Sequence, residues 1–193
     1  MEILPKLTKN CHLQVLFRPP SQWKWARQAT KFIAVALFVL IACSSQAATR
    51  RAQSGVVTRV VDGDTLWVTT SASQQTLKVR IQGIDAPEIC QTDGLQAREA
   101  LMRRVLGQTV TVTSGAHDNY GRTVGTVHLQ GQDMGRWLVS QGHAWVYSYR
   151  HKKGPYADEL RQARSEQRGV FSDVAAEEPR VFRKRHGSCY LRR

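Results

Sequence analysis

The sequence is poor in cysteine and in acidic residues, and it contains a single long apolar run. Its 193 residues include four cysteines, none of them in a Cys-x-x-Cys pair, and this spacing argues against a zinc site. The apolar run covers twelve residues, 32–43, which is short for a membrane-spanning helix of about 20 residues. No internal repeat is visible, and the length suits one domain of ordinary size with additional segments.

The apolar run predicts an export signal. Basic residues precede residues 32–43 (FIAVALFVLIAC), and small and polar residues follow them, which is the pattern of a secretory signal peptide over residues 1–47. The mature protein would then be secreted or periplasmic. Two alternatives remain open: the segment 40–43 (LIAC) resembles a lipoprotein cleavage site with Cys43 as the lipidated residue, and the run could stay uncleaved as a membrane anchor.

The positive charge of the chain is concentrated at its two ends. The formal net charge is +13, from 28 basic and 15 acidic residues, and this suggests an anionic partner such as nucleic acid or an anionic surface. Residues 1–47 hold six of the basic residues and one acid, and residues 180–193 hold six basic residues and no acid. Residues 48–179 are nearly balanced, so a functional site there has to be argued from particular residues.

The pattern between the two ends predicts an α+β domain. Strands are expected at residues 55–61, 65–70, 76–82, 108–114 and 122–129. Helices are expected at residues 94–107, 133–141 and 155–168. Five short strands with a helix between the third and the fourth match an OB-fold β-barrel, which is a common platform for nucleic acids. We predict a linker over residues 48–54, the domain over residues 55–173 and a basic tail over residues 174–193.

Three separated segments of this domain carry unusual charges. Residues 60–68 (VVDGDTLWV) contain two aspartates, residues 79–88 (VRIQGIDAPE) contain an arginine and two acids, and residues 118–122 (DNYGR) end in an arginine. Each segment alone could be a turn, a solvated strand face or a capping sequence. Together, carboxylates suit a hard cation such as Ca²⁺, and arginines suit a phosphate. The combination is what phosphodiester cleavage requires.

The same three segments resemble the signature segments of the staphylococcal nuclease family. The resemblance covers about residues 55–173, and the three segments together are far more specific than any one of them. It implies an OB barrel with three helices and a Ca²⁺-dependent phosphodiesterase that acts on DNA, RNA or both. It implies nucleic acid as the partner, and a monomer with no stable protein partner.

The resemblance also implies which residues hold the metal. Asp64 and Asp85 stand at the positions of the metal-binding carboxylates. Ala86 stands where the best-known family member has threonine, at a position that offers its backbone carbonyl to the metal. Alanine has the same carbonyl, so this departure leaves the expected metal site intact.

The remaining catalytic positions are present as well. Glu88 stands at the position of the residue that activates or orients the attacking water, and Arg80 and Arg122 stand at the positions of the two phosphate-binding arginines. Pro87 fixes its own φ and favours an extended Ala86, a geometry that could direct Asp85 and the Ala86 carbonyl toward one point.

Three tyrosines resemble the aromatic residues that the family places near the nucleotide. Tyr120 precedes the Gly-Arg pair of the third segment and fits the position of a base-stacking ring. Tyr147 and Tyr149 resemble a second aromatic pair, although the spacing around them differs by one residue. For these two the alternative of a core or rim aromatic remains open.

Cys90 and Cys189 are the two cysteines that remain after removal of residues 1–47, and in an exported protein they are candidates for a disulfide. Such a bond would hold the basic segment 180–185 near the loop that contains Glu88. The alternative is two free thiols.

A second function class has to be weighed against the enzyme. Some relatives in the family have lost the catalytic set and serve as nucleic-acid-binding OB modules without catalysis. Both metal-binding acids, Glu88 and both arginines are present in this sequence, and their presence favours the enzyme.

Overall fold

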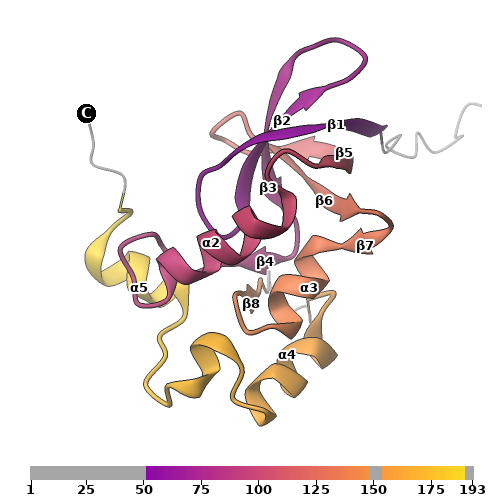
Figure 1. Ribbon diagram of the computed structural model, residues 1–193. Helices are drawn as coiled ribbons and strands as arrows, with labels where there is room; N and C mark the ends of the chain where they lie inside the picture. Colours follow the sequence, from indigo (N-terminus) through magenta and orange to yellow (C-terminus); the bar gives the residue numbers. More distant parts are fainter. Residues whose placement is uncertain (1–50, 148–153, 190–193) are drawn as a thin grey trace, which may run out of the picture. The chain divides into compact units, whose positions relative to one another are not determined.

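The computed structural model describes residues 51–147 and 154–189 (Figure 1). The predicted signal peptide over residues 1–47, with Cys43, and the predicted substrate-binding residue Tyr149 lie outside the described residues. Within the two described stretches, no helix combines the length and the apolar character that crossing a membrane requires.

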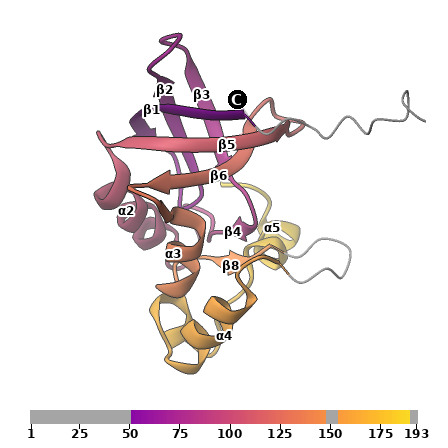
Figure 2. The ribbon, with the colours of Figure 1, turned by 90° about the vertical axis from the view of Figure 1, so that its right-hand side faces the viewer.

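Five strands form a closed barrel. They follow one another in the order β3-β2-β1-β5-β6, and a parallel pairing between β3 and β6 closes the sheet on itself. Their bounds are β1 (Arg51–Val60), β2 (Thr65–Thr70), β3 (Thr76–Ile81), β5 (Thr109–His117) and β6 (Thr123–Leu129). The two-residue β7 (Gln132–Asp133) pairs antiparallel with the end of β6, while β4 (Ile84–Asp85) pairs with β8 (Trp145–Val146) in a separate small sheet. The predicted OB barrel is confirmed (Figures 1 and 2).

β-branched and aliphatic side chains fill the barrel because alternate positions of each strand face inward. The buried residues of the five strands include Val57, Val60, Leu66, Val68, Val79, Ile81, Val110, Val112 and Val127. Gly55 is required where β1 lies close against its paired strand β2, since a Cβ there would lie 2.4 Å from the Thr69 carbonyl oxygen.

The three predicted helices are present with slightly different bounds. They are α2 (Gly94–Val105), α3 (Met134–Ser140) and α4 (Ala157–Ser165), and the short 3₁₀ helix η1 (Gly169–Ser172) follows them. α2 and α3 each bury one stripe of small or apolar residues, for example Ala97, Leu101 and Val105 in α2, whereas α4 buries Ala163. The Asp133 side chain caps α3 by accepting hydrogen bonds from two backbone N–H groups of its first turn.

The linker prediction is wrong for residues 51–54. These residues form the first part of β1 and pair with residues 111–114 of β5. Three of the four side chains are exposed, and the fourth is only partly buried. Backbone pairing, not burial of apolar side chains, therefore holds the segment in the sheet, and the sequence has no apolar alternation there.

The predicted basic tail, residues 174–193, is also folded over part of its length. It contains a fourth helix, α5 (Pro179–His186), which lies beside the loop that leads into α2 (Figures 1 and 2). Pro179 occupies the first turn of α5 and is buried. The helix is strongly polar, so the sequence offered charge but little apolar periodicity to indicate it.

Candidate functional site

The first carboxylate of the site belongs to the turn between β1 and β2. The Asp64 side chain is buried and accepts hydrogen bonds from the Thr65 hydroxyl at 3.0 Å and from the backbone N–H of Ala86 at 2.9 Å. The Asp62 side chain accepts a hydrogen bond from the Asp64 N–H at 3.0 Å, which holds the turn. A Cβ at Gly63 would lie 2.7 Å from the Ala86 Cβ, so glycine allows the turn to contact the later segment.

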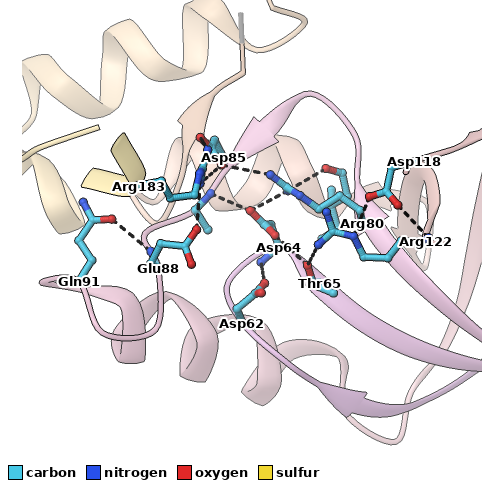
Figure 3. A network of polar contacts seen from close by, with 12 residues as sticks. Asp62, Asp64, Thr65, Arg80, Asp85, Glu88, Gln91, Asp118, Arg122 and Arg183 are labelled. Carbon is cyan, nitrogen blue, oxygen red and sulfur yellow. Dashed lines mark hydrogen bonds and ion pairs between the residues drawn. The ribbon is translucent and has the colours of Figure 1, made fainter. Parts of the chain in front are cut away.

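The second carboxylate lies in β4, directly after the barrel strand that carries Arg80. Asp85 is buried and its backbone pairs with Trp145 in β8. The Arg80 guanidinium contacts both acids: its Nη1 lies 2.6 Å from Asp64 Oδ2, and its Nη2 lies 3.1 Å from Asp85 Oδ1 (Figure 3). Arg80 therefore joins the two predicted metal-binding carboxylates in one network.

The buried position of Asp64 changes its acidity. Burial raises the pKa of its carboxyl above the ordinary aspartate value, and the nearby carboxylates of Asp62 and Asp85 raise it further. The Arg80 guanidinium and the Ala86 N–H oppose this rise, because both favour the ionised form. A cation bound beside Asp64 would also favour the ionised form, so binding of a cation and loss of the proton are linked.

Glu88 is held by the short loop between β4 and α2. Its backbone N–H donates to Gln91 Oε1 at 3.2 Å, and Gln91 Nε2 donates to the Glu177 carbonyl at 2.7 Å. A Cβ at Gly94 would overlap the backbone carbonyl of Glu88, so a glycine is needed where α2 starts against this loop. Gln91 thus connects the Glu88 loop to the segment that precedes α5.

The third segment places Arg122 through a tight turn before β6. Asp118 accepts from the backbone N–H groups of Tyr120 at 3.0 Å and of Arg122 at 2.9 Å, and from Arg122 Nε at 2.7 Å. Partial burial would raise the pKa of Asp118, but these hydrogen bonds outweigh it and hold the pKa below the ordinary value. Arg122 Nη1 also lies 3.4 Å from the Thr65 hydroxyl, which connects it to Asp64 (Figure 3).

A pocket of about 540 Å³ brings most of the predicted site residues together. Those that line it are Asp64, Arg80, Asp85, Ala86, Glu88, Tyr120 and Arg122. Tyr120 is 84% exposed, and the Arg122 guanidinium carbon lies over its ring, 5.4 Å from the ring centre. Tyr147 does not line this pocket, and its backbone N–H donates to the Gly83 carbonyl.

The structure joins Cys90 and Cys189 in a disulfide, with their Cα atoms 5.7 Å apart. Cys90 follows Glu88 by two residues, and Cys189 follows α5. The bond therefore places the C-terminal helix next to the Glu88 loop.

Sequence reasoning missed several residues of the site. Arg183 of α5 lines the pocket and contacts both Asp85 and Glu88 (Figure 3). The predicted disulfide brought the basic segment near this loop, but it could not single out the residue that enters the pocket. Asp118 was missed as well, although it begins the third signature segment and holds its arginine.

Comparison with known proteins identifies the family. The family model described as Staphylococcal nuclease homologue matches residues 78–173, which include the second and third segments of the site. A protein named micrococcal nuclease from Shigella flexneri is 33% identical over 172 residues, which cover 83% of this chain and 95% of the relative. The chain belongs to the staphylococcal nuclease family.

Other members of the staphylococcal nuclease family match over a similar extent. A protein named uncharacterized endonuclease from Escherichia coli O157:H7 is 37% identical over 133 residues, or 68% of this chain and 85% of the relative. A protein of the same name from Haemophilus influenzae is 32% identical over 146 residues, or 76% of this chain and 79% of the relative. These matches extend well beyond the three signature segments.

The site of this staphylococcal nuclease homologue suits a hard cation. Within the described stretches, no group of three or more His, Cys, Asp and Glu side chains is arranged to hold a metal. Two buried carboxylates, Asp64 and Asp85, nevertheless converge on one guanidinium, so the pocket is built around a positive charge. Carboxylate oxygens of this kind are the ligand type that Ca²⁺ prefers.

Proposed function

We propose that the chain is a Ca²⁺-dependent nuclease that hydrolyses phosphodiester bonds in DNA, RNA or both. One observation carries the proposal: a single pocket gathers two buried carboxylates, a third acid and two arginines from three separated segments. Carboxylates to hold a cation, an acid to handle water and arginines to hold phosphate are the parts that hydrolysis of a phosphodiester needs. The names of the relatives, nuclease and endonuclease, support the same reaction.

Asp64, Asp85 and the backbone carbonyl of Ala86 would hold the Ca²⁺ ion. When bound, the ion supplies positive charge that neutralises the phosphate and polarises its P–O bonds. Asp64 is fixed for this role by the Thr65 hydroxyl and the Ala86 N–H. Asp85 is fixed by the pairing of β4 with β8.

Glu88 is the group that handles the attacking water in this proposal. Its carboxylate lines the pocket beside Asp85, and its backbone is held by Gln91. It accepts the proton, or the hydrogen bond, of a water that attacks the phosphorus from the side opposite the leaving oxygen. A positioned general base of this kind contributes about 10²–10⁴-fold in rate.

Arg80 and Arg122 stabilise the negative charge that builds on the phosphate oxygens. Both side chains line the pocket, and each guanidinium presents several donors in one plane. Asp118 fixes Arg122 through two of its oxygen contacts, which leaves the outer end of the guanidinium toward the pocket. The exposed Tyr120 ring supplies a face on which a base can stack.

We further propose that the protein acts outside the cytoplasm, as a secreted or periplasmic enzyme. The predicted signal peptide over residues 1–47 supports this location. The Cys90–Cys189 disulfide supports it too, because such bonds persist in oxidising compartments. Export would also separate a nuclease from the nucleic acids of the cell that makes it.

Cleavage of defined substrates tests the proposed reaction. The purified protein is incubated with single-stranded and duplex DNA and RNA, with Ca²⁺ or with EDTA, beside a Glu88→Gln variant prepared in the same way. We expect cleavage with Ca²⁺ by the wild type, none with EDTA, and almost none by the variant, which also controls for contaminating nucleases. Binding of nucleic acid without cleavage of any substrate would assign the chain to the non-catalytic OB modules instead.

A further inference from the structure

We propose that Arg183 competes with the metal for the active-site carboxylates, so that α5 acts as a built-in cation that a metal ion has to displace. The proposal rests on the proposed metal site. It concerns a segment outside the three signature segments and outside residues 78–173, which the family model matches.

The Arg183 guanidinium binds the Asp85 carboxylate through both of its terminal nitrogens. Its Nη2 lies 2.9 Å from Asp85 Oδ2, and its Nη1 lies 3.1 Å from Asp85 Oδ1 and 3.0 Å from Glu88 Oε1 (Figure 3). The Asp85 side chain is only 6% exposed and that of Arg183 is 33% exposed, so water screens this contact less than a surface ion pair. A bidentate pair of this kind is among the stronger charge-assisted contacts in proteins.

The contact leaves Asp85 little capacity for a metal. Its Oδ1 accepts hydrogen bonds from both Arg80 and Arg183, and its Oδ2 accepts from Arg183. A divalent cation on the same oxygens would lie within a few ångströms of the Arg183 charge, where like charges repel strongly. Arg183, which contacts both oxygens of Asp85, therefore competes with a metal ion for this carboxylate.

The chain holds α5 in place from both sides. After the helix, Cys189 is bonded to Cys90, which follows Glu88 by two residues. Before the helix, the Glu177 carbonyl accepts a hydrogen bond from Gln91 at 2.7 Å. Cys90 and Gln91 both lie on the loop that carries Glu88. The two attachments therefore keep the Arg183 guanidinium at a high effective concentration beside Glu88 and Asp85.

An arginine side chain stays protonated in proteins at any ordinary pH. Only movement of Arg183 can therefore remove its positive charge from the carboxylates of Asp85 and Glu88. A site that is open for a fraction of the time binds its ligand more weakly by that fraction. Arg183 should accordingly weaken metal binding.

Calorimetric titration of Ca²⁺ into the metal-free full chain, without nucleic acid, tests the competition directly. The variants are Arg183→Gln, which keeps a polar side chain but removes the guanidinium and its charge, and Arg180→Gln, an exposed arginine of the same helix that serves as the matched control. We expect Arg183→Gln to bind Ca²⁺ about tenfold more tightly than the wild type, and Arg180→Gln to match the wild type. Equal or weaker Ca²⁺ binding by Arg183→Gln would overturn the proposal.

The same titration separates this proposal from the proposed function. If neither the wild type nor Arg183→Gln binds Ca²⁺, the metal site itself is wrong and the competition falls with it. If both bind Ca²⁺ equally, the metal site stands and only the competition is overturned. Circular dichroism and a melting curve in EDTA show whether each variant is folded.

Loosening the tether gives an independent measurement. A Cys90→Ser/Cys189→Ser double variant should tighten Ca²⁺ binding several-fold when Arg183 is present, because the effective concentration of its guanidinium falls. The same double change in an Arg183→Gln background should leave the Ca²⁺ affinity unchanged. An equal change in Ca²⁺ affinity in both backgrounds would show that the disulfide affects the metal site without Arg183. This result would overturn the proposal that the disulfide holds Arg183 against the carboxylates.

Discussion

Asp64 accepts a hydrogen bond at 2.9 Å from the backbone N–H of Ala86, which lies 22 positions later in the chain. This contact joins the Asp-Gly-Asp turn to the segment that carries Asp85 and Glu88, so two separated signature segments form one site. Gly63 makes the approach possible, since a Cβ there would lie 2.7 Å from the Ala86 Cβ.

Lysine should not replace either arginine of the pocket. Arg80→Lys and Arg122→Lys each keep a positive charge but lose the planar set of donors, and we expect each to lower kcat by about 10²–10³-fold. Arg136→Lys is the matched control, because Arg136 is exposed, pairs with Glu159 and does not line the pocket. Steady-state cleavage of a short oligonucleotide measures the effect. Rates within twofold or so of the wild type for Arg80→Lys or Arg122→Lys would rule out a planar grip on the phosphate.

Asp118 should matter for activity although it would not touch the substrate. Asp118→Asn removes the charge that holds Arg122 Nε at 2.7 Å, and it leaves an N–H group facing another donor. We expect the loss of this charged hydrogen-bond partner of Arg122 to lower kcat/KM by about tenfold. The control is Asp158→Asn, an aspartate whose ion pair with Arg161 is fully on the surface. If the two variants have the same kcat/KM, Asp118 does not position Arg122.

The disulfide should contribute to stability. It spans 99 positions of the chain, and a loop of that size gives an entropic stabilisation of up to about 4–5 kcal/mol, often less in practice. For a domain of this size the Cys90→Ser/Cys189→Ser variant should melt about 10 °C lower than the wild type. Differential scanning calorimetry measures the change, and a peptide map of the non-reduced protein verifies the bond. An unchanged melting temperature, or both thiols free in protein from an oxidising compartment, would speak against it.

Metal binding should weaken as the pH falls. Burial raises the pKa of Asp64, so its carboxyl takes up a proton at a pH where an ordinary aspartate is still ionised. Without metal, the pKa of the Asp64 carboxyl is higher in the folded than in the unfolded protein. Protonation of this group therefore stabilises the fold as the pH falls. Binding of Ca²⁺ requires the ionised Asp64 carboxylate, so the stabilisation that Ca²⁺ gives shrinks as the pH falls.

The measurement for this pH dependence is the rise in melting temperature that Ca²⁺ causes, compared between about pH 8.5 and about pH 5.5. We expect the rise to be clearly larger at the higher pH. Asp64→Asn is the control, since it cannot titrate and should show little response to Ca²⁺ at either pH. An equal rise at both pH values in the wild type would show that Asp64 does not control metal binding.

The sequence allowed prediction of the barrel and of the pocket because both depend on local patterns. The predicted strand 65–70 matches β2 in its bounds, since its residues alternate between buried and partly buried positions from Leu66 to Thr70. The three charged segments follow barrel strands or turns, and closure of the barrel through β3 and β6 brings Arg80 and Arg122 to the same end.

The C-terminal part could not be predicted in the same way. The position of Arg183 depends on the disulfide and on the hydrogen bond of Gln91 to Glu177. These contacts join segments that are distant in the chain, and they produce no periodic pattern in the sequence. Residues 51–54 extend β1 through backbone pairing alone, which composition does not reveal. Tyr147 resembles a nucleotide-contacting residue in sequence, yet it is not one of the residues that line the pocket.

The most direct measurement compares single-turnover cleavage of a labelled oligonucleotide by the wild type and by Glu88→Gln, with Ca²⁺ binding and oligonucleotide binding measured for both. The amide fits the space of the carboxylate but cannot take a proton from water, while Asp64, Asp85 and both arginines remain. The account predicts that Glu88→Gln binds Ca²⁺ and the oligonucleotide at least as well as the wild type and cleaves about 10²–10⁴-fold more slowly. Cleavage by Glu88→Gln at the wild-type rate would contradict it.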